Sequence, residues 1–241
     1  MKAFRYILTA LSVLFLCPSC YIHFTEKARQ EWKASLNENL EEKCDSVREV
    51  KPFSALRLSG PFSYEYTPSK GTPAVRIEAP ASQLGDIIIT DEDGQLRIEQ
   101  KKRSRKFEVR SDIHIHISGG ELESISMAGS GDFHCEALRL RENDRTLSVQ
   151  LAGSGDIDLE KVHGEEIQIQ LAGSGDIRIG QLRTDRLKVW LAGSGDITLA
   201  GQAKEASFQL NGSGDIDAES LRTGSVLEKE VQGSGKIRLG R

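Results

Sequence analysis

The sequence predicts an all-β protein, folded as a parallel β-helix-like solenoid of ~20-residue coils, with an irregular β section and an amphipathic helix before it. The first observation is one phrase that occurs six times, as in Leu151-Ala-Gly-Ser-Gly-Asp-Ile157. The first glycines of the copies are Gly129, Gly153, Gly173, Gly193, Gly212 and Gly233, separated by 24, 20, 20, 19 and 21 residues. A regular spacing of this size is typical of units that stack on one another.

The second observation is that apolar and polar residues alternate on both sides of each phrase. In the third copy the apolar residues are Ile167, Ile169 and Leu171 before the glycine, and Ile177 and Ile179 after it. Alternation with period two predicts strands with one buried face. Each unit is therefore a strand, a Gly-Ser-Gly-Asp bend, a second strand and a looser return. A propeller blade needs about 40 residues and four strands, so the short unit favours the β-helix.

Stacking predicts that equivalent residues form inward columns along the core. Cys135 falls in the column of Leu159, and Phe133 in that of Ile157. The long first interval places a polar loop at 141–145. The last unit is atypical, with Lys229 in an inward column and Lys236 where the other copies have Asp.

The chain begins with features of an export signal, which we assign to residues 1–19. Lys2 and Arg5 precede an apolar run, 7–16, that is too short to span a bilayer. Cys20 after the small Ser19 predicts a lipoprotein processing site, with Cys20 as the lipidated N-terminus and the membrane as a partner through that anchor. Cys17 fits less well, because Leu16 precedes it. An ordinary cleaved signal and an uncleaved anchor are the alternatives.

Residues 20–50 hold the lipidated cysteine and a predicted amphipathic helix. Apolar residues recur there every four positions, at Phe24, Ala28, Trp32, Leu36, Leu40 and Cys44. This helix packs on the body of the protein, covers an open end of the β-helix, or mediates self-association. Residues 51–118 predict irregular strands with a turn at 91–94, and residues 119–241 are the repeat β-helix, in one elongated body.

Three features together resemble a known family. They are the run Val50-Lys-Pro-Phe-Ser-Ala-Leu-Arg-Leu-Ser-Gly-Pro-Phe62, the Leu96-Arg-Ile98 strand after an acidic turn, and the Gly-Ser-Gly-Asp phrases. They resemble the head GIN domain, a domain of unknown function labelled an auto-transporter adhesin and common in envelope lipoproteins of Bacteroides-like bacteria. The resemblance implies a right-handed β-helix-like fold and an exported protein, and it supplies no catalytic residues. The predicted N-terminal helix is an addition to the usual pattern.

The repeat corners form the first candidate site. Their carboxylates, Asp132, Asp156, Asp176, Asp196 and Asp215, stack about 4.8 Å apart in the predicted solenoid. The structural interpretation is that each carboxylate accepts backbone N–H groups at its corner, and the functional one is a row of Ca²⁺ sites. We expect the structural role, no metal and no calcium dependence.

The candidate ligand surface is the outward row three residues before each glycine. It contains Gln150, Gln170, Trp190 and Gln209. An aromatic face between amides suits sugar rings. The alternative is that Trp190 packs under a loop or a contact helix.

Three further features have a structural and a functional interpretation. The basic tip, Lys101, Lys102, Arg103, Arg105 and Lys106, is a solvated hairpin tip or a contact for an anionic polysaccharide or lipid headgroup. His114 and His116 share a strand face but lack an evident third metal ligand. Cys135 pairs with Cys44 in an oxidising compartment or stays a buried free thiol.

Charge and pattern together favour a binding protein over an enzyme. Without Lys2 and Arg5 the chain has 30 basic and 36 acidic residues, which disfavours nucleic acid as a partner. Carboxylates that repeat at corners, with short connections, indicate a scaffold, so we expect no catalytic residues and no cofactor. We predict an envelope lipoprotein of the outer membrane that binds a glycan or surface polymer. The alternatives are a structural or self-assembling envelope module and, less favoured, a β-helix enzyme acting on polysaccharide.

Overall fold

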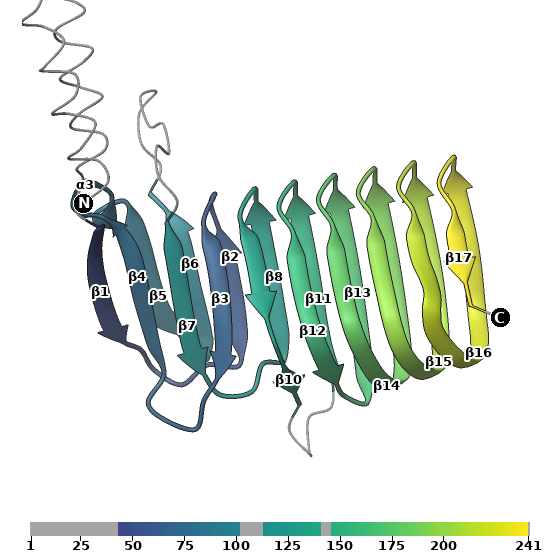
Figure 1. Cartoon of the computed structure of the whole chain (residues 1–241), viewed down its shortest axis with the longest axis horizontal. Coiled ribbons are helices and arrows are strands. Elements are labelled where there is room, and N and C mark those ends of the chain that lie inside the picture. Colours follow the sequence, from purple (N-terminus) through teal and green to yellow (C-terminus); the bar gives the residue numbers. More distant parts are fainter. Residues whose placement is uncertain (1–42, 102–112, 141–145, 241) are drawn as a thin grey trace, which may run out of the picture. The chain divides into compact units, whose positions relative to one another are not determined.

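The computed structural model describes residues 43–101, 113–140 and 146–240, which belong to one compact unit (Figure 1). The strands are β1 (Lys43–Glu49), β2 (Ala55–Ser59), β3 (Ser63–Pro68), β4 (Ala74–Pro80), β5 (Ile87–Glu92), β6 (Gln95–Gln100), β7 (His114–Gly119), β8 (Ser124–Gly129), β9 (Asp132–Cys135), β10 (Leu138–Arg139), β11 (Thr146–Gly153), β12 (Ile157–His163), β13 (Glu166–Gly173), β14 (Ile177–Gly193), β15 (Ile197–Gly212), β16 (Ile216–Gly233) and β17 (Ile237–Leu239). The one helix among the described residues is α3 (Ala81–Leu84).

The repeats stack as a solenoid of parallel strands, as the sequence predicts. Leu171 of β13 lies opposite Leu151 of β11 on one side and Leu191 of β14 on the other. The two predicted columns are confirmed as well, since Cys135 lies opposite Leu159 and Phe133 opposite Ile157. Figure 1 shows the coils as a row of similar ribbons from β8 to β16.

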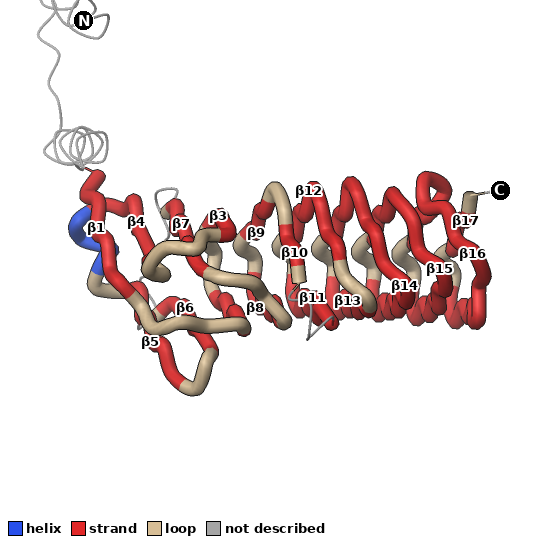
Figure 2. Tube along the Cα trace, turned by 90° about the horizontal axis from the view of Figure 1, so that it is seen from below, coloured by secondary structure: helices blue, strands red, loops and turns tan. Residues whose placement is uncertain are grey.

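Each full coil consists of three short extended segments, and each segment has one face buried in the core. In β14 the alternation of buried and exposed residues is interrupted at 180–181 and again at 185–186, and the corner phrase follows at Gly193. A coil therefore has three outward faces, and the inward residues fill the interior. Burial of each Leu or Ile side chain in these columns contributes about 2 kcal/mol. The looser return predicted between repeats is largely strand in β14 and β15, because it pairs in parallel with the neighbouring coils (Figure 2).

The corner phrase needs both of its glycines. Gly173 has φ 146°, a conformation that favours glycine, and a Cβ there would lie 2.1 Å from the carbonyl oxygen of Gly153. A Cβ at Gly175 would lie 1.9 Å from the oxygen of Gly155. This close approach lets the N–H groups of Ser174 and Gly175 donate to Gly153 O at 2.9 and 3.2 Å.

The section before the repeats adds two more coils, and their order in space differs from their order in sequence. β2 and β3 pair in parallel with β8 and β9, and Gly60, with φ 128°, takes the place of Gly129. On the other side β2 and β3 pair in parallel with β6 and β7. The β2–β3 coil thus lies between the later β6–β7 coil and the first repeat, as Figure 1 shows.

Antiparallel strands close the solenoid beyond the β6–β7 coil. β5 pairs with β6 through a tight turn in which Asp93 and Gly94 have φ 50° and 72°, which confirms the predicted turn. β4 pairs with β7, and β1 pairs with β4 as the outermost strand.

The helix predicted for residues 20–50 is wrong at its C-terminal end. Residues Lys43–Glu49, which include Cys44, form β1, because pairing with the edge of β4 supplies backbone hydrogen bonds that outweigh a local four-residue pattern. The part of that helix before Lys43 and the signal segment lie outside the described residues, as does the loop at 141–145.

The last described coil is less covered than the others. β17 pairs with β16 only from Ile216 to Ala218. Lys229 lies opposite the buried Phe208, in the expected column, but it is exposed because no further described coil lies over it. Val226, Leu227 and Val231 of the same strand are 40%, 65% and 42% exposed.

Candidate functional site

The candidate ligand surface lies on one outward face of the solenoid, formed by β11, β13, β14 and β15. The register aligns the side chains of Gln150, Gln170, Trp190 and Gln209 on four successive coils. Successive members are about 4.8 Å apart, the spacing of paired strands. We call this row the amide–Trp row.

Trp190 stands beside a shallow hollow of about 470 Å³ on this face. Its side chain is 36% exposed, whereas the neighbouring Val189 and Leu191 are buried in the core. The buried neighbours thus fix the backbone of β14 at this position, while part of the Trp190 surface faces solvent. Sequence reasoning missed the second outward row, two residues before the first, which lines the hollow with Gln168, Lys188, Ser207 and Glu228. The alternation of apolar and polar residues in the sequence predicts that these side chains also point outward.

Hydrogen bonds engage three amides of this face and leave one for a ligand. Gln150 Nε2 donates to Ser148 Oγ at 3.4 Å. Gln209 Nε2 donates to Glu228 Oε1 at 2.9 Å, and Gln168 Nε2 donates to Glu166 Oε1 at 2.8 Å. Gln170, next to Trp190, makes no side-chain hydrogen bond within the described part of the chain. Its carbonyl and amino groups can therefore accept from and donate to a ligand hydroxyl.

A charged cluster borders the row at Glu166. Lys188 Nζ lies 2.8 Å from Glu166 Oε1, and Arg186 Nε lies 3.1 Å from Oε2. Hydrogen bonds from Lys188, Gln168 and Arg186 lower the pKa of Glu166 to about 2. At neutral pH the carboxylate is ionised, and it positions Lys188 beside the hollow.

The corner carboxylates form a ladder of hydrogen bonds from one coil to the next. The backbone N–H of Asp176 donates to Asp156 Oδ1 at 3.0 Å, and that of Asp196 donates to Asp176 Oδ1 at 3.0 Å. The same bond joins Asp156 to Asp132 and Asp215 to Asp196, and Lys236 ends the ladder by donating to Asp215 at 2.8 Å. Arg178 and Arg238 pair with Asp176 and Asp215. The carboxylates thus have structural partners.

The other candidate residues do not converge on one site. Lys101 is exposed and donates its N–H to Asp86 O, while Lys102, Arg103, Arg105 and Lys106 lie outside the described residues, as does Cys20. Cys135 is a buried free thiol whose pKa burial raises to about 11, and it forms no disulfide with Cys44.

His116 has carboxylate neighbours that the sequence did not reveal. They are Glu65 at 2.8 Å and Glu78 at 3.5 Å. Across residues 43–101, 113–140 and 146–240, however, no three His, Cys, Asp or Glu residues are grouped as metal ligands. Within the same residues, no helix has the length and apolar character needed to cross a bilayer.

Comparison with known families gives one match over most of the chain. The family described as "Putative auto-transporter adhesin, head GIN domain" matches residues 52–240. No curated protein matches the chain.

Solved structures share the fold. A "putative lipid binding protein" of Parabacteroides distasonis has a TM-score of 0.70 at 20% identity, covering 84% of this chain and 98% of its own. A "putative adhesin" of Bacteroides fragilis has a TM-score of 0.64 at 21% identity, covering 82% and 96%. Another "putative adhesin", from Parabacteroides merdae, has a TM-score of 0.69 at 16% identity, covering 84% and 98%.

Proposed function

The chain belongs to the head GIN domain family, and from that premise we propose that it is a non-enzymatic adhesive protein of the cell envelope that binds a glycan through the amide–Trp row. The observation that carries this proposal is the alignment of a partly exposed Trp190 with the unpartnered amide of Gln170 one coil away. An indole ring offers an apolar face to a sugar ring, while the amide can pair with its hydroxyls.

The chemistry of this face supports a glycan over a lipid. The hollow beside Trp190 is shallow and is lined mainly by amide, hydroxyl and charged side chains. The apolar side chains of the repeats, such as Leu171 and Leu191, point inward and fill the core. A lipid tail needs an apolar cavity, so the description of one structural neighbour as lipid-binding does not fit this surface.

The proposed adhesive role includes export and anchoring at the membrane. We propose that residues 1–19 are the signal and Cys20 is the lipidated residue, with the solenoid at the outer membrane. Cys20→Ser should abolish incorporation of labelled palmitate and release the protein from the membrane fraction. Protease treatment of intact cells then tells whether the solenoid faces outward.

A glycan array with the full chain tests the proposed ligand class. Trp190→Ala should lower the signal of the bound glycans by about tenfold, and Trp190→Tyr should retain most of it, because Tyr keeps an aromatic face. Ile88→Ala, a truncation of a residue 40% exposed on another part of the chain, is the matched control. Unchanged binding by Trp190→Ala, with equal folding of both variants, contradicts the proposal.

A second candidate function is a self-assembling envelope module, which the last described coil favours. Its apolar residues Leu227 and Val231 are exposed beside an edge of β16 that has no partner strand among the described residues beyond Ala218. A second copy of the chain is the occupant that fits, since two such edges can pair about a two-fold axis and bury these side chains. Leu227→Lys should then shift sedimentation from dimer to monomer, and a monomeric unmodified chain excludes this module.

A further inference from the structure

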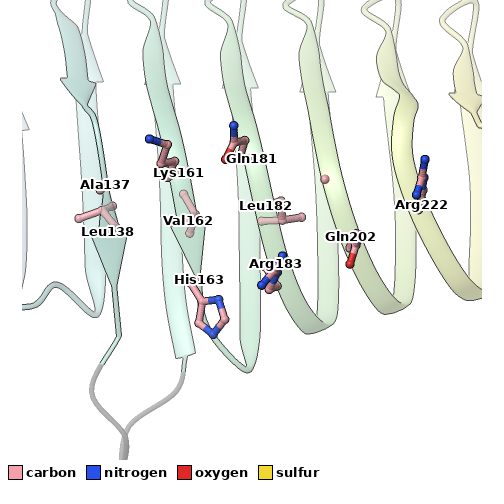
Figure 3. A pocket seen from close by; sticks show the side chains of 11 residues that line it. Ala137, Leu138, Lys161, Val162, His163, Gln181, Leu182, Arg183, Gln202 and Arg222 are labelled. Atoms are coloured by element: carbon pink, nitrogen blue, oxygen red, sulfur yellow. The ribbon is translucent and has the colours of Figure 1, made fainter.

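A second outward face of the repeats carries a row of polar side chains that includes two arginines, and we call this row the basic ladder. It consists of His163, Arg183 and Arg222, with Gln202 between the two arginines. These residues come from β12, β14, β15 and β16, and Figure 3 shows them on four successive coils. Register and strand spacing put Arg183 about 5 Å from His163 and about 10 Å from Arg222 at the backbone.

The basic ladder lies along two adjoining hollows of about 700 and 750 Å³, which share all four residues. One cause of the hollow is Gly201, which takes the place of Leu182 in the next coil and contributes no side chain. A Cβ there would lie 2.1 Å from Leu182 O, so the position cannot be filled without moving the backbone. Leu138, Val162 and Leu182 lie beneath the hollow and are buried in the core, so the side chains that face solvent here are mainly polar.

The charges of the basic ladder are not neutralised by the protein. The first hollow is lined by Lys161, His163, Arg183 and Arg222 and by no carboxylate. The second contains one, Asp185, which is already paired with Lys204 at 2.8 Å. An extended anion with its own carboxylates would supply the missing charge.

Most other arginines in the described repeats are ion-paired, unlike those of the basic ladder. Arg178, Arg186, Lys188 and Arg238 each lie within 3.2 Å of a carboxylate oxygen. Arg183 and Arg222 have no carboxylate partner within the described part of the chain. The chain has an excess of acidic residues, 36 against 32, yet among the described residues these two arginines are left unpaired beside the hollow.

We propose that the basic ladder binds a linear acidic polysaccharide, with its carboxylates on Arg183 and Arg222 and its sugar hydroxyls on Gln181 and Gln202. The cations are spread along the solenoid axis, which suits a repeating anion more than a single phosphate. Gln202, between the two arginines, and Gln181, on the same strand as Arg183, can pair with neutral hydroxyls. This site is independent of the amide–Trp row, since the corner at 185–186 separates Arg183 from Trp190.

Titration calorimetry of the full chain with oligogalacturonate tests the inference. Arg183→Gln combined with Arg222→Gln should weaken binding by about tenfold at low salt. Arg178→Gln combined with Arg238→Gln removes the same charge from a neighbouring face where both residues are ion-paired, and should change affinity less than about twofold. Melting curves check that both variants fold.

Three results would overturn the basic ladder as a polysaccharide site. Equal losses of affinity in the two double variants would show that the polysaccharide is held by nonspecific electrostatic attraction to the protein. Binding of anionic phosphatidylglycerol vesicles without binding of oligogalacturonate would assign the face to a membrane, and binding of neutral dextran oligomers with equal affinity would remove the role of charge. Trp190→Ala should leave oligogalacturonate binding intact. The proposal for the amide–Trp row and the proposal for the basic ladder can therefore be rejected independently.

Discussion

The second glycine of each corner is the residue on which stacking imposes the tightest limit. A Cβ at Gly175 would lie 1.9 Å from Gly155 O. The N–H groups of Gly175 and Gly155 each donate to the preceding coil, at Gly153 O and Gly129 O, so neither backbone can move freely. Gly175→Ala should therefore lower the free energy of unfolding by more than about 3 kcal/mol or prevent folding. Urea denaturation followed by circular dichroism measures this change.

Gly120→Ala is the matched control for that substitution. A Cβ at Gly120 has no atom within 4 Å, and its backbone is not among those with positive φ. The free energy of unfolding should change by less than about 1 kcal/mol. If both variants unfolded alike, backbone contact at the corner would not be the reason for the repeated glycine.

The corner aspartates serve as acceptors between coils, and this predicts a difference between two substitutions. Asp176→Ala removes the acceptor of the Asp196 N–H and should cost about 1 kcal/mol of stability. Asp176→Asn keeps an oxygen in place and should cost less. A chelator should leave the melting temperature of the unmodified chain unchanged, and a large fall would instead support a cation in the corner row.

Glu166 links stability to pH through its two cationic neighbours. Its pKa is about 2 in the folded chain and 4.5 ordinarily. Its stabilising effect is fully present above about pH 4.5 and disappears as the pH falls toward 2. Glu166→Gln should lower stability by about 1 kcal/mol at pH 7, since the partners are exposed, and the two chains should converge near pH 2. Denaturant titrations across this range check it, and a constant difference would exclude the ion pairs as its cause.

Whole coils behave as interchangeable elements, because each contacts only its neighbours. Residues 177–196 form one repeat, and Ile177 and Ile197 occupy equivalent places. Deleting 177–196 should therefore give a folded, shorter solenoid with a modestly lower melting temperature. Deleting only 177–186 breaks the register and should abolish cooperative unfolding. Scanning calorimetry of both chains decides, and a folded half-coil deletion would contradict parallel stacking.

The elements that could be predicted from the sequence are those whose pattern repeats. Period-two alternation and the corner phrase gave the strands, the parallel stacking and the Cys135 column, and register then aligned Gln170 with Trp190. Local pattern did not reveal β1, because pairing with β4 decides its structure. The basic ladder was not predicted either, because Arg183 and Arg222 belong to the return segment, which contains no repeated motif.

The order of the coils along the whole solenoid could not be predicted from the sequence. The run around Gly60 lacks the second glycine and the Asp of the corner phrase, yet it forms the coil next to the first repeat. The strands between β3 and β8 include β4 and β5, which pair antiparallel with β7 and β6 and cover the end of the solenoid. Such an end protects the parallel edge from pairing with other chains.

Disulfide trapping in a chain without its native cysteines tests this order. Ser59 lies opposite Ala128 on one side and Glu99 on the other, so Ser59→Cys with Ala128→Cys should cross-link under mild oxidation. Glu99→Cys with Ala128→Cys should not, because two strand spacings, about 9.6 Å, exceed the reach of a disulfide. Were the coils stacked in chain order, β6 would adjoin β8 and the second pair would cross-link instead. Mobility on a non-reducing gel, with peptide mass spectrometry of the linked residues, separates the two arrangements.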